Sequence, residues 1–326
     1  MKENQTFYYI TDWNVKPGHY TFDKHRFPQG YIELMPWYCV TWKDVKSTII
    51  GDGNIVFANT PVHNELAKLK IIEELINKGN KVIIIQEGNF ESWYDWPADA
   101  QELYIKLLDK CVAWMCDHAR EKEASIYTKN LLFPRICANT YAAEPRGWGG
   151  DFIYIVNPIK RYQTGMVAHK IVYDYTPKDV PVCSHNYIRP VNPEPYISYP
   201  DAYKMPGFTL LDGCTPDEWL ERIYRCKFGV NITRDHAGDN TILEFASMGI
   251  PIIGNQNSFV QKDLFPDISF DYRDAEGIGQ TIRRLLTDKI FYNEVAFKAY
   301  DRAINHWGST TVVNEFKQNL QKYIKI

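Results

Sequence analysis

Short apolar runs alternate along the chain with amphipathic stretches. A continuous apolar run is typical of a strand buried on both faces, and apolar residues that recur every three or four positions are typical of a helix. The apolar runs lie at residues 7–10, 55–58, 81–85, 112–116, 131–138, 152–156, 182–184, 208–211, 228–233, 250–253 and 268–270. The amphipathic stretches lie at residues 64–78, 99–110, 215–226, 241–249, 259–264, 274–286, 290–306 and 309–325. Strands and helices in this alternation predict an α/β fold with parallel sheets.

The alternation falls into two series, separated by a glycine-rich segment at residues 146–150. Closely spaced glycines give a backbone the freedom of a hinge, so we place a domain boundary there. The predicted domains are residues 1–147 and 148–306, followed by a terminal helical segment at 307–326. A chain of 326 residues is long enough for each domain to have its own core.

Helix starts are marked at four places, one of them Asp274, which we expect to cap a helix that runs to Leu286. Thr215 is followed by a proline and by Glu218, an arrangement typical of a first helical turn. Two pairs of residues match the capping box, in which a side chain at the helix start and an acid three residues later satisfy backbone N–H groups. These pairs are Asp99 with Glu102 and Thr241 with Glu244.

Residues 13–46 show no regular pattern and are rich in aromatic rings, with lysines and arginines between them. Two interpretations stay open for this region. Basic groups interleaved with rings can hold a phosphate backbone and stacked bases. The same composition also describes a solvated rim around a small aromatic cluster.

Composition and charge narrow the class of protein. Hydrophobic residues make up 45% of the chain and charged residues 24%, as in soluble globular proteins. The net charge of −3 argues against tight nonspecific binding to nucleic acid. Seven scattered cysteines without a Cys-x-x-Cys pair favour a reducing compartment. The sequence has no signal-peptide pattern and no apolar run near the ~18 residues of a membrane span, so we expect a cytoplasmic protein.

Several enzyme classes lack their motifs in this sequence. It contains no Gly-x-Ser-x-Gly elbow, no Walker loop and no Gly-x-Gly-x-x-Gly after the first strand, which disfavours hydrolases, NTPases and dehydrogenases. His-Glu-x-x-His and Asp-x-Asp spacings are also absent, so we expect neither a metal nor another cofactor.

Residues 234–254 are the most informative stretch. A buried strand precedes them, a polar loop opens a short helix near Thr241, and Gly249 ends that helix before another apolar strand. Ligands of open α/β sheets bind beyond the carboxyl ends of the strands, and unpaired N–H groups at a helix start, here around Asn240, can receive phosphate. Glu244 could then accept hydrogen bonds from a ribose. Helix capping by Thr241 and Glu244 is the alternative.

The sequence from His236 to Glu244, continued by Phe-Ala-Ser-Met-Gly-Ile-Pro, resembles the donor-site signature of retaining GT-B glycosyltransferases. That signature is an acid, seven residues, a glutamate, and a short apolar helix that ends in Gly-x-Pro. Here His236 stands at the first acidic position, with Asp235 beside it. The resemblance implies two Rossmann-like domains facing a central cleft, with the C-terminal helix crossing back to the first domain.

Three segments are similar to a narrower group, the phage DNA α-glucosyltransferases. They are residues 82–87, 113–118 and 241–251. The resemblance implies that Glu87 or His118 faces the acceptor hydroxyl and that His236 faces the donor sugar. It also implies a set of residues that bind the donor: Lys160, Arg161, Asn240, Thr241 and Glu244. Taken singly, His118 could instead be a structural histidine, and Lys160 and Arg161 a solvated strand end.

The expected function is therefore transfer of a hexose or pentose, with retention, from a UDP-sugar-like donor to a hydroxyl acceptor. The resemblance suggests a hydroxymethylated pyrimidine in phage DNA as acceptor, in the host cytoplasm, reached by exposing the base. Mild acidity of the chain counts against DNA. A polysaccharide or small-molecule acceptor, and a nucleotide-sugar-binding protein without catalytic activity, are the alternatives.

Overall fold

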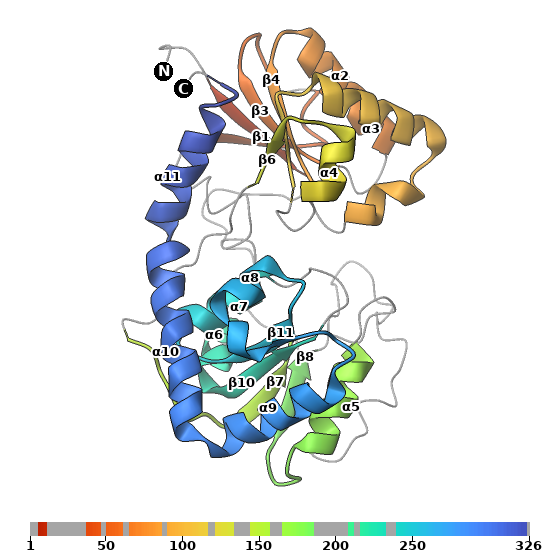
Figure 1. Cartoon of the computed structure of the whole chain (residues 1–326). Helices are drawn as coiled ribbons and strands as arrows, with labels where there is room; N and C mark the ends of the chain where they lie inside the picture. The colour runs from red at the N-terminus through yellow and green to blue at the C-terminus, as the bar shows by residue number, and fades with distance from the viewer. Residues whose placement is uncertain are drawn as a thin grey trace. The chain divides into compact units, whose positions relative to one another are not determined.

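The computed structural model describes residues 6–11, 37–46, 50–60, 65–86, 90–116, 121–133, 144–156, 165–185, 208–211, 216–232 and 239–324. The chain divides into two compact units (Figure 1). Unit 1 comprises Met1–Arg135 together with Val312–Ile326, and unit 2 comprises Ile136–Thr311.

The described strands of unit 1 form one parallel sheet in the order β2-β1-β3-β4-β5-β6. They are β1 (Phe7–Thr11), β2 (Trp37–Thr41), β3 (Ile55–Asn59), β4 (Lys81–Ile85), β5 (Ala113–Met115) and β6 (Leu131–Leu132). β3 is buried along its whole length, because helices cover both faces of such a sheet and apolar side chains are needed on both.

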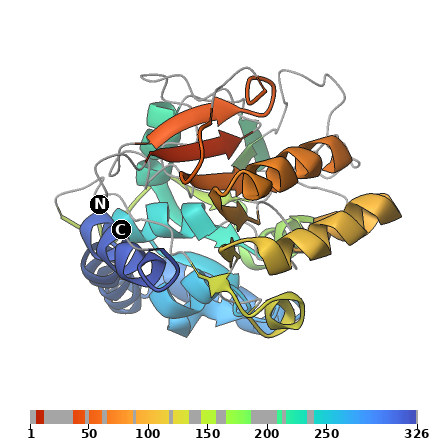
Figure 2. The same ribbon diagram turned by 90° about the horizontal axis from the view of Figure 1, so that it is seen from above.

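Different parts of the chain cover the two faces of this sheet. On one face α2 (Glu65–Asn77) and α3 (Ala98–Lys110) lie side by side, followed by α4 (Glu121–Tyr127) (Figures 1 and 2). A 3-10 turn, η1 (Phe90–Asp95), precedes α3. The opposite face meets α11 (Ser309–Leu320), where Phe316 contacts the Phe57 ring at 6.2 Å between centroids. Unit 1 is therefore completed by the last part of the sequence.

Unit 2 contains a second parallel sheet, in the order β12-β11-β10-β7-β8-β9. Its strands are β7 (Phe152–Ile155), β8 (Val182–His185), β9 (Phe208–Leu211), β10 (Cys226–Asn231), β11 (Ile252–Asn255) and β12 (Ser269–Phe270). Numbered within the unit, this is the order 3-2-1-4-5-6 reversed, the order of dinucleotide-binding folds. The strand order changes direction between β7 and β10. This place is the switch point of the sheet, and ligands of such sheets bind there.

Helices form a layer on each side of this sheet (Figure 1). α5 (Gly165–Tyr175) packs against α9 (Ala275–Thr287). In the other layer α7 (Asp239–Ser247) contacts α6 (Pro216–Arg225), α8 (Phe259–Leu264) and α10 (Lys289–His306). A 3-10 turn, η4 (Pro266–Ile268), connects α8 to β12. No described helix is long and apolar enough to cross a lipid bilayer.

Several local predictions were wrong. β2 lies inside the region predicted to be irregular, and α4 and α5 were not predicted. β11 begins at Ile252, two residues later than expected. The capping box at Asp99 does not form: α3 begins at Ala98, and Asp99 Oδ1 accepts a hydrogen bond from the N–H of Ala100 instead. By contrast, Asp274 caps α9 as predicted, with Oδ1 2.9 Å from the backbone nitrogen of Gly277.

The glycine-rich segment at 146–150 belongs to unit 2 and is hydrogen-bonded to other parts of it. The Arg146 guanidinium donates to the carbonyl of Tyr224 and to the hydroxyl of Tyr292, both at 2.7 Å, and its backbone N–H donates to the carbonyl of Met248. The predicted domain boundary after residue 147 stays a prediction.

Candidate functional site

The carboxyl ends of β7 and β10 meet at the point where the strand order of unit 2 changes direction. Ile155 pairs with Val230, and the backbone N–H of Val156 donates to the carbonyl of Val230 at 3.0 Å. The two segments that leave these strands, residues 157–164 and 233–238, lie outside the described residues. Both begin at neighbouring points of the same sheet edge, where α/β sheets bind ligands.

The packing of α7 on β10 depends on Gly229. A Cβ atom at this position would lie 2.7 Å from the Phe245 ring and 2.9 Å from Ile252, closer than side chains can approach. The missing side chain therefore lets the helix approach the strand.

The far end of α7 is closed by Gly249. This residue has φ +66°, and it and Ile250 donate to the carbonyls of Ala246 and Phe245, as in a Schellman motif. Since α7 ends there, near Pro145 and the amino end of the sheet, its first turn lies at the carboxyl edge.

Two asparagines near this first turn, the buried Asn231 and the partly buried Asn240, each have an inaccessible Oδ1 atom without a hydrogen-bond partner in the described part of the chain. Asn231 is 3% exposed and ends β10, on the same face of the sheet as Gly229 because side chains alternate along a strand. Asn240 is in the first turn of α7. Neither Oδ1 atom has a partner among the described residues. An unsatisfied buried polar group costs about 1–3 kcal/mol, and a ligand bound at this edge of the sheet would offset that cost by donating to these two acceptors.

Glu244, one turn further along α7, has its carboxylate held from the neighbouring helix. The indole nitrogen of Trp219, on α6, donates to Oε2 of Glu244 at 2.7 Å. Trp219 is 6% exposed and packs edge-on against Tyr154 of β7, with ring centroids 5.3 Å apart. The switch point, the start of α7 and the Glu244 carboxylate are thus joined through β7, β10 and α6.

The capping box predicted from Thr241 and Glu244 does not describe this geometry. α7 begins at Asp239, so Thr241 is the third helical residue rather than the cap. One hydrogen bond to the Glu244 carboxylate comes from the indole of Trp219, on the neighbouring helix. The prediction failed because the helix extends two residues further toward the polar loop.

The other predicted site residues fall on segments that the structure does not describe. These are Glu87, His118, Lys160, Arg161 and His236. Their proposed roles stay predictions. Of the predicted donor residues, the structure brings together Asn240, Thr241 and Glu244 on α7.

Two residues of this site were not singled out from the sequence. Asn231 is a polar residue at the end of an apolar strand, a signal that could have been used. Trp219 lies 25 positions before Glu244 on a different helix, and no local pattern links the two.

The carboxyl edge of the sheet in unit 1 carries a separate polar cluster. Thr60 donates through Oγ1 to the carbonyl of Ile85 at 2.7 Å, and the Tyr104 hydroxyl donates to Oε1 of Gln86 at 2.9 Å. Tyr104 is fully buried, and burial raises its pKa, so the hydroxyl stays protonated. Gln86 is the last described residue before Glu87, whose role toward the acceptor stays a prediction.

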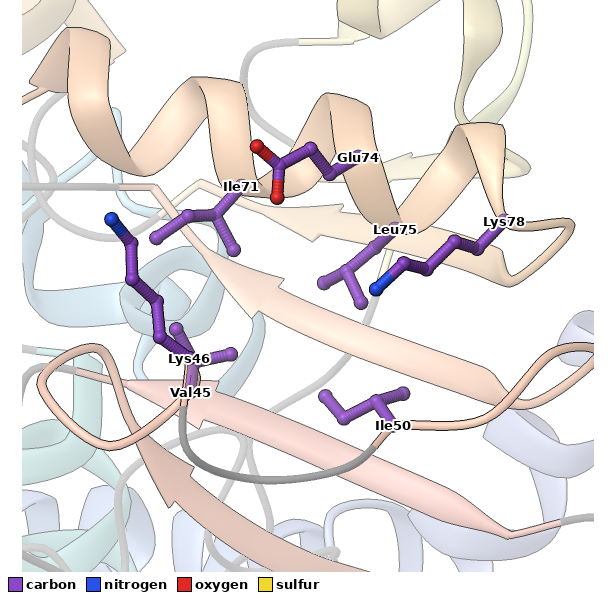
Figure 3. A pocket seen from close by; sticks show the side chains of 7 residues that line it. All are labelled: Val45, Lys46, Ile50, Ile71, Glu74, Leu75 and Lys78. Carbon is purple, nitrogen blue, oxygen red and sulfur yellow. The ribbon is translucent and has the colours of Figure 1, made fainter.

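A hollow of about 290 Å³ in unit 1 lies elsewhere (Figure 3). Its lining comes from the segment after β2 and from α2: Val45, Lys46, Ile50, Ile71, Glu74, Leu75 and Lys78. The lining of α2 includes its last two turns, which lead to the amino end of β4. None of the lining residues belongs to the candidate site of unit 2.

Metal-ligating side chains do not cluster in the part of the chain that the structure describes: no group of three His, Cys, Asp or Glu residues could hold an ion there.

Comparison with solved structures identifies the architecture. HepE from Anabaena, in complex with UDP and glucose, matches with a TM-score of 0.70 and 10% identity over 98% of this chain and 100% of HepE. The α,α-trehalose 6-phosphate synthase of Burkholderia multivorans matches with a TM-score of 0.64 and 10% identity over 86% of this chain and 74% of its own.

TarM of S. aureus, in complex with fondaparinux, α-GlcNAc-glycerol and UDP, matches with a TM-score of 0.60 and 13% identity over 85% of this chain. The match covers only 57% of TarM. No protein-family model and no curated protein matches the sequence. The described strands form two parallel six-stranded sheets, and the whole architecture is similar to these solved structures. Both findings confirm the predicted fold class: the chain has the α/β architecture of GT-B glycosyltransferases.

Proposed function

We propose that this protein is a nucleotide-sugar-dependent glycosyltransferase whose donor binds at the carboxyl edge of β7 and β10. The observation that carries the proposal is the pair of buried, unsatisfied asparagine acceptors beside the start of α7. The solved proteins with the same fold include complexes with UDP, which is consistent with a nucleotide donor here.

Each part of the donor has a matching group in this proposal. N–H groups in the first turn of α7, around Asn240 and Thr241, receive the diphosphate, together with Lys160 and Arg161. The Glu244 carboxylate accepts hydrogen bonds from the ribose hydroxyls. Asn231 and Asn240 accept hydrogen bonds from hydroxyl or imide N–H groups of the donor.

The chemistry requires stabilisation of a leaving group rather than a nucleophilic triad. The bond between the anomeric carbon and the diphosphate breaks, and its electron pair leaves on the diphosphate oxygen. The acceptor oxygen then forms the new bond to the anomeric carbon on the same face of the sugar. Cations and oriented N–H groups stabilise the charge that develops on the diphosphate. In our proposal Glu87 or His118 receives the proton of the acceptor hydroxyl, and His236 contacts the donor sugar.

Two acceptor classes follow from different observations. The resemblance of residues 82–87 and 113–118 to phage DNA α-glucosyltransferases favours a hydroxymethylated pyrimidine in DNA. The net charge of −3 favours an acceptor that is not a polyanion, such as a glycan or a small polyol. Incubation with labelled UDP-glucose separates them, using duplex DNA with hydroxymethylcytosine, the same duplex with cytosine, and a panel of glycans. Transfer to a glycan alone would reject the DNA acceptor.

Donor binding is tested first, by calorimetry with UDP and UDP-glucose. We expect Glu244→Ala to weaken UDP binding by about tenfold or more, the effect of losing a hydrogen bond to a charged group. Glu276→Ala is the matched control, because Glu276 lies in the same unit on α9 and accepts a hydrogen bond from Tyr175. Equal UDP affinity in both variants would contradict the donor site.

Catalysis needs a separate measurement. A protein that binds UDP-sugar but neither hydrolyses nor transfers the sugar on any acceptor would be a binding protein and not an enzyme. Retention is checked by the NMR coupling constant of the product's anomeric proton, which we expect to report the same configuration as in the donor.

A further inference from the structure

We infer that Trp219 is a positioning residue: it orients Glu244, so that the preference of the donor site for ribose over 2′-deoxyribose depends on its indole N–H. The inference rests on the proposed function, because it concerns the nucleotide half of the donor. The underlying observation is the 2.7 Å hydrogen bond from the indole nitrogen to Oε2 of Glu244.

The indole is fixed in place before any ligand arrives. Trp219 is buried on α6, and its ring meets the fully buried ring of Tyr154 at an interplanar angle of 67°. Tyr154 belongs to β7, the strand on one side of the switch point. An edge-on contact of this kind restrains the ring plane, and with it the direction of the N–H bond.

Glu244 needs such restraint because its side chain is long. A glutamate on a half-buried helix face has three rotatable bonds, and ordering it on ligand binding costs conformational entropy. An N–H that is already bonded to one carboxylate oxygen selects one side-chain orientation in advance. Each carboxylate oxygen can accept more than one hydrogen bond, so the contact with Trp219 is compatible with a ribose hydroxyl donating to the same group.

The indole leaves its partner in the role of acceptor. Trp Nε1–H is a donor only, so Oε2 of Glu244 accepts in this contact. A vicinal diol donates to an ionised carboxylate, and a 2′-deoxyribose has lost one of the two donors. The discrimination should therefore weaken when the carboxylate is no longer held in one orientation.

Trp219→Phe tests the inference, because it keeps an aromatic ring against Tyr154 and removes the donor. Calorimetry with UDP and 2′-deoxy-UDP gives the ratio of the two affinities. We expect a ratio of about ten or more in the wild-type protein, the effect of one hydrogen bond to a charged group, and a ratio reduced to about threefold or less in Trp219→Phe.

Trp307→Phe is a closely matched control. Trp307 is equally buried in unit 2, and its indole nitrogen donates to Oδ2 of Asp263 at 2.8 Å, as Trp219 does to Glu244. A general loss of stability from removing an indole–carboxylate hydrogen bond should appear in both variants. A loss of ribose preference should appear only in Trp219→Phe.

The outcomes separate the inference from the proposed function. If the wild-type protein prefers UDP and Trp219→Phe keeps the wild-type ratio, Trp219 is only a packing residue and the inference is wrong. If the wild-type protein binds no UDP, the proposed function itself is wrong. Should Trp219→Phe not fold, Trp219→Leu serves in its place, since leucine is apolar and carries no hydrogen-bond donor in its side chain. An unchanged ratio there would equally overturn the inference.

Discussion

Polar side chains at the carboxyl edges of the two sheets differ in their hydrogen-bond partners. In unit 1 the buried hydroxyl of Tyr104 donates to Gln86, and Thr60 donates to the backbone of β4. In unit 2 the Oδ1 atoms of Asn231 and Asn240 have no partners among the described residues. The hydroxyls of Tyr104 and Thr60 are therefore bonded to groups of the unit 1 edge, whereas these two acceptors of unit 2 are not bonded to described groups of theirs. In our proposal the nucleotide binds at the edge of unit 2.

The largest effect should come from moving α7 away from its strand. Gly229→Ala places a methyl group 2.7 Å from the Phe245 ring, so the helix must shift. Overpacking of this kind costs about 1–3 kcal/mol, and the displaced helix start should also lose UDP affinity. Chemical denaturation and calorimetry measure the two effects.

Gly51→Ala provides the contrast in unit 1, because its Cβ would meet only Asn54 at an ordinary 3.6 Å. We expect it to change neither stability nor UDP binding by a measurable amount. A Gly229→Ala protein with wild-type UDP affinity would mean that the position of α7 does not matter for the donor.

A smaller effect, confined to unit 1, is expected from Tyr104→Phe. Removing the hydroxyl leaves Oε1 of Gln86 without this donor, which should lower the free energy of unfolding by about 1–2 kcal/mol. UDP affinity should stay at the wild-type value, since the nucleotide is assigned to unit 2. A Tyr104→Phe protein that loses UDP binding would break the comparison between the edges.

Apart from the Gly51→Ala control, Asn231→Val should have the smallest effect on stability, and that effect should have the opposite sign. Valine suits a buried strand and removes an unsatisfied acceptor, so the protein should become more stable by about 1 kcal/mol, or roughly 2 °C in melting temperature. UDP-sugar affinity should fall about tenfold if Asn231 is a ligand. A purely structural asparagine would instead give lower stability with unchanged affinity, and that result would remove Asn231 from the site.

The sequence was informative about elements and less so about contacts. Continuous apolar runs located strands such as β4, and Asp274 marked the start of α9, because both signals are local. β2 was missed since its aromatic residues continue an irregular, ring-rich region. α5 was missed in part because Val167, Ile171 and Val172 are β-branched and favour strands.

The candidate site was predictable only where it is continuous in sequence. Asn240, Thr241 and Glu244 were found from a single stretch, because one helix carries them. Trp219 reaches Glu244 through the packing of α6 on α7, which depends on the whole unit. The burial of Asn231 likewise follows from the helix above the strand, and not from its neighbours in sequence.

The division of α11 between the units has a consequence for how the chain matures. Phe316 and Tyr323, which contact Phe57 and the carbonyl of Leu131, follow all of unit 2 in the sequence. During synthesis the sheet of unit 1 is complete long before the helix that shields one of its faces has left the ribosome. While roughly half of the protein is made, this face of the sheet lacks its contacts with α11, and in that interval a chaperone or another chain can bind the exposed apolar groups.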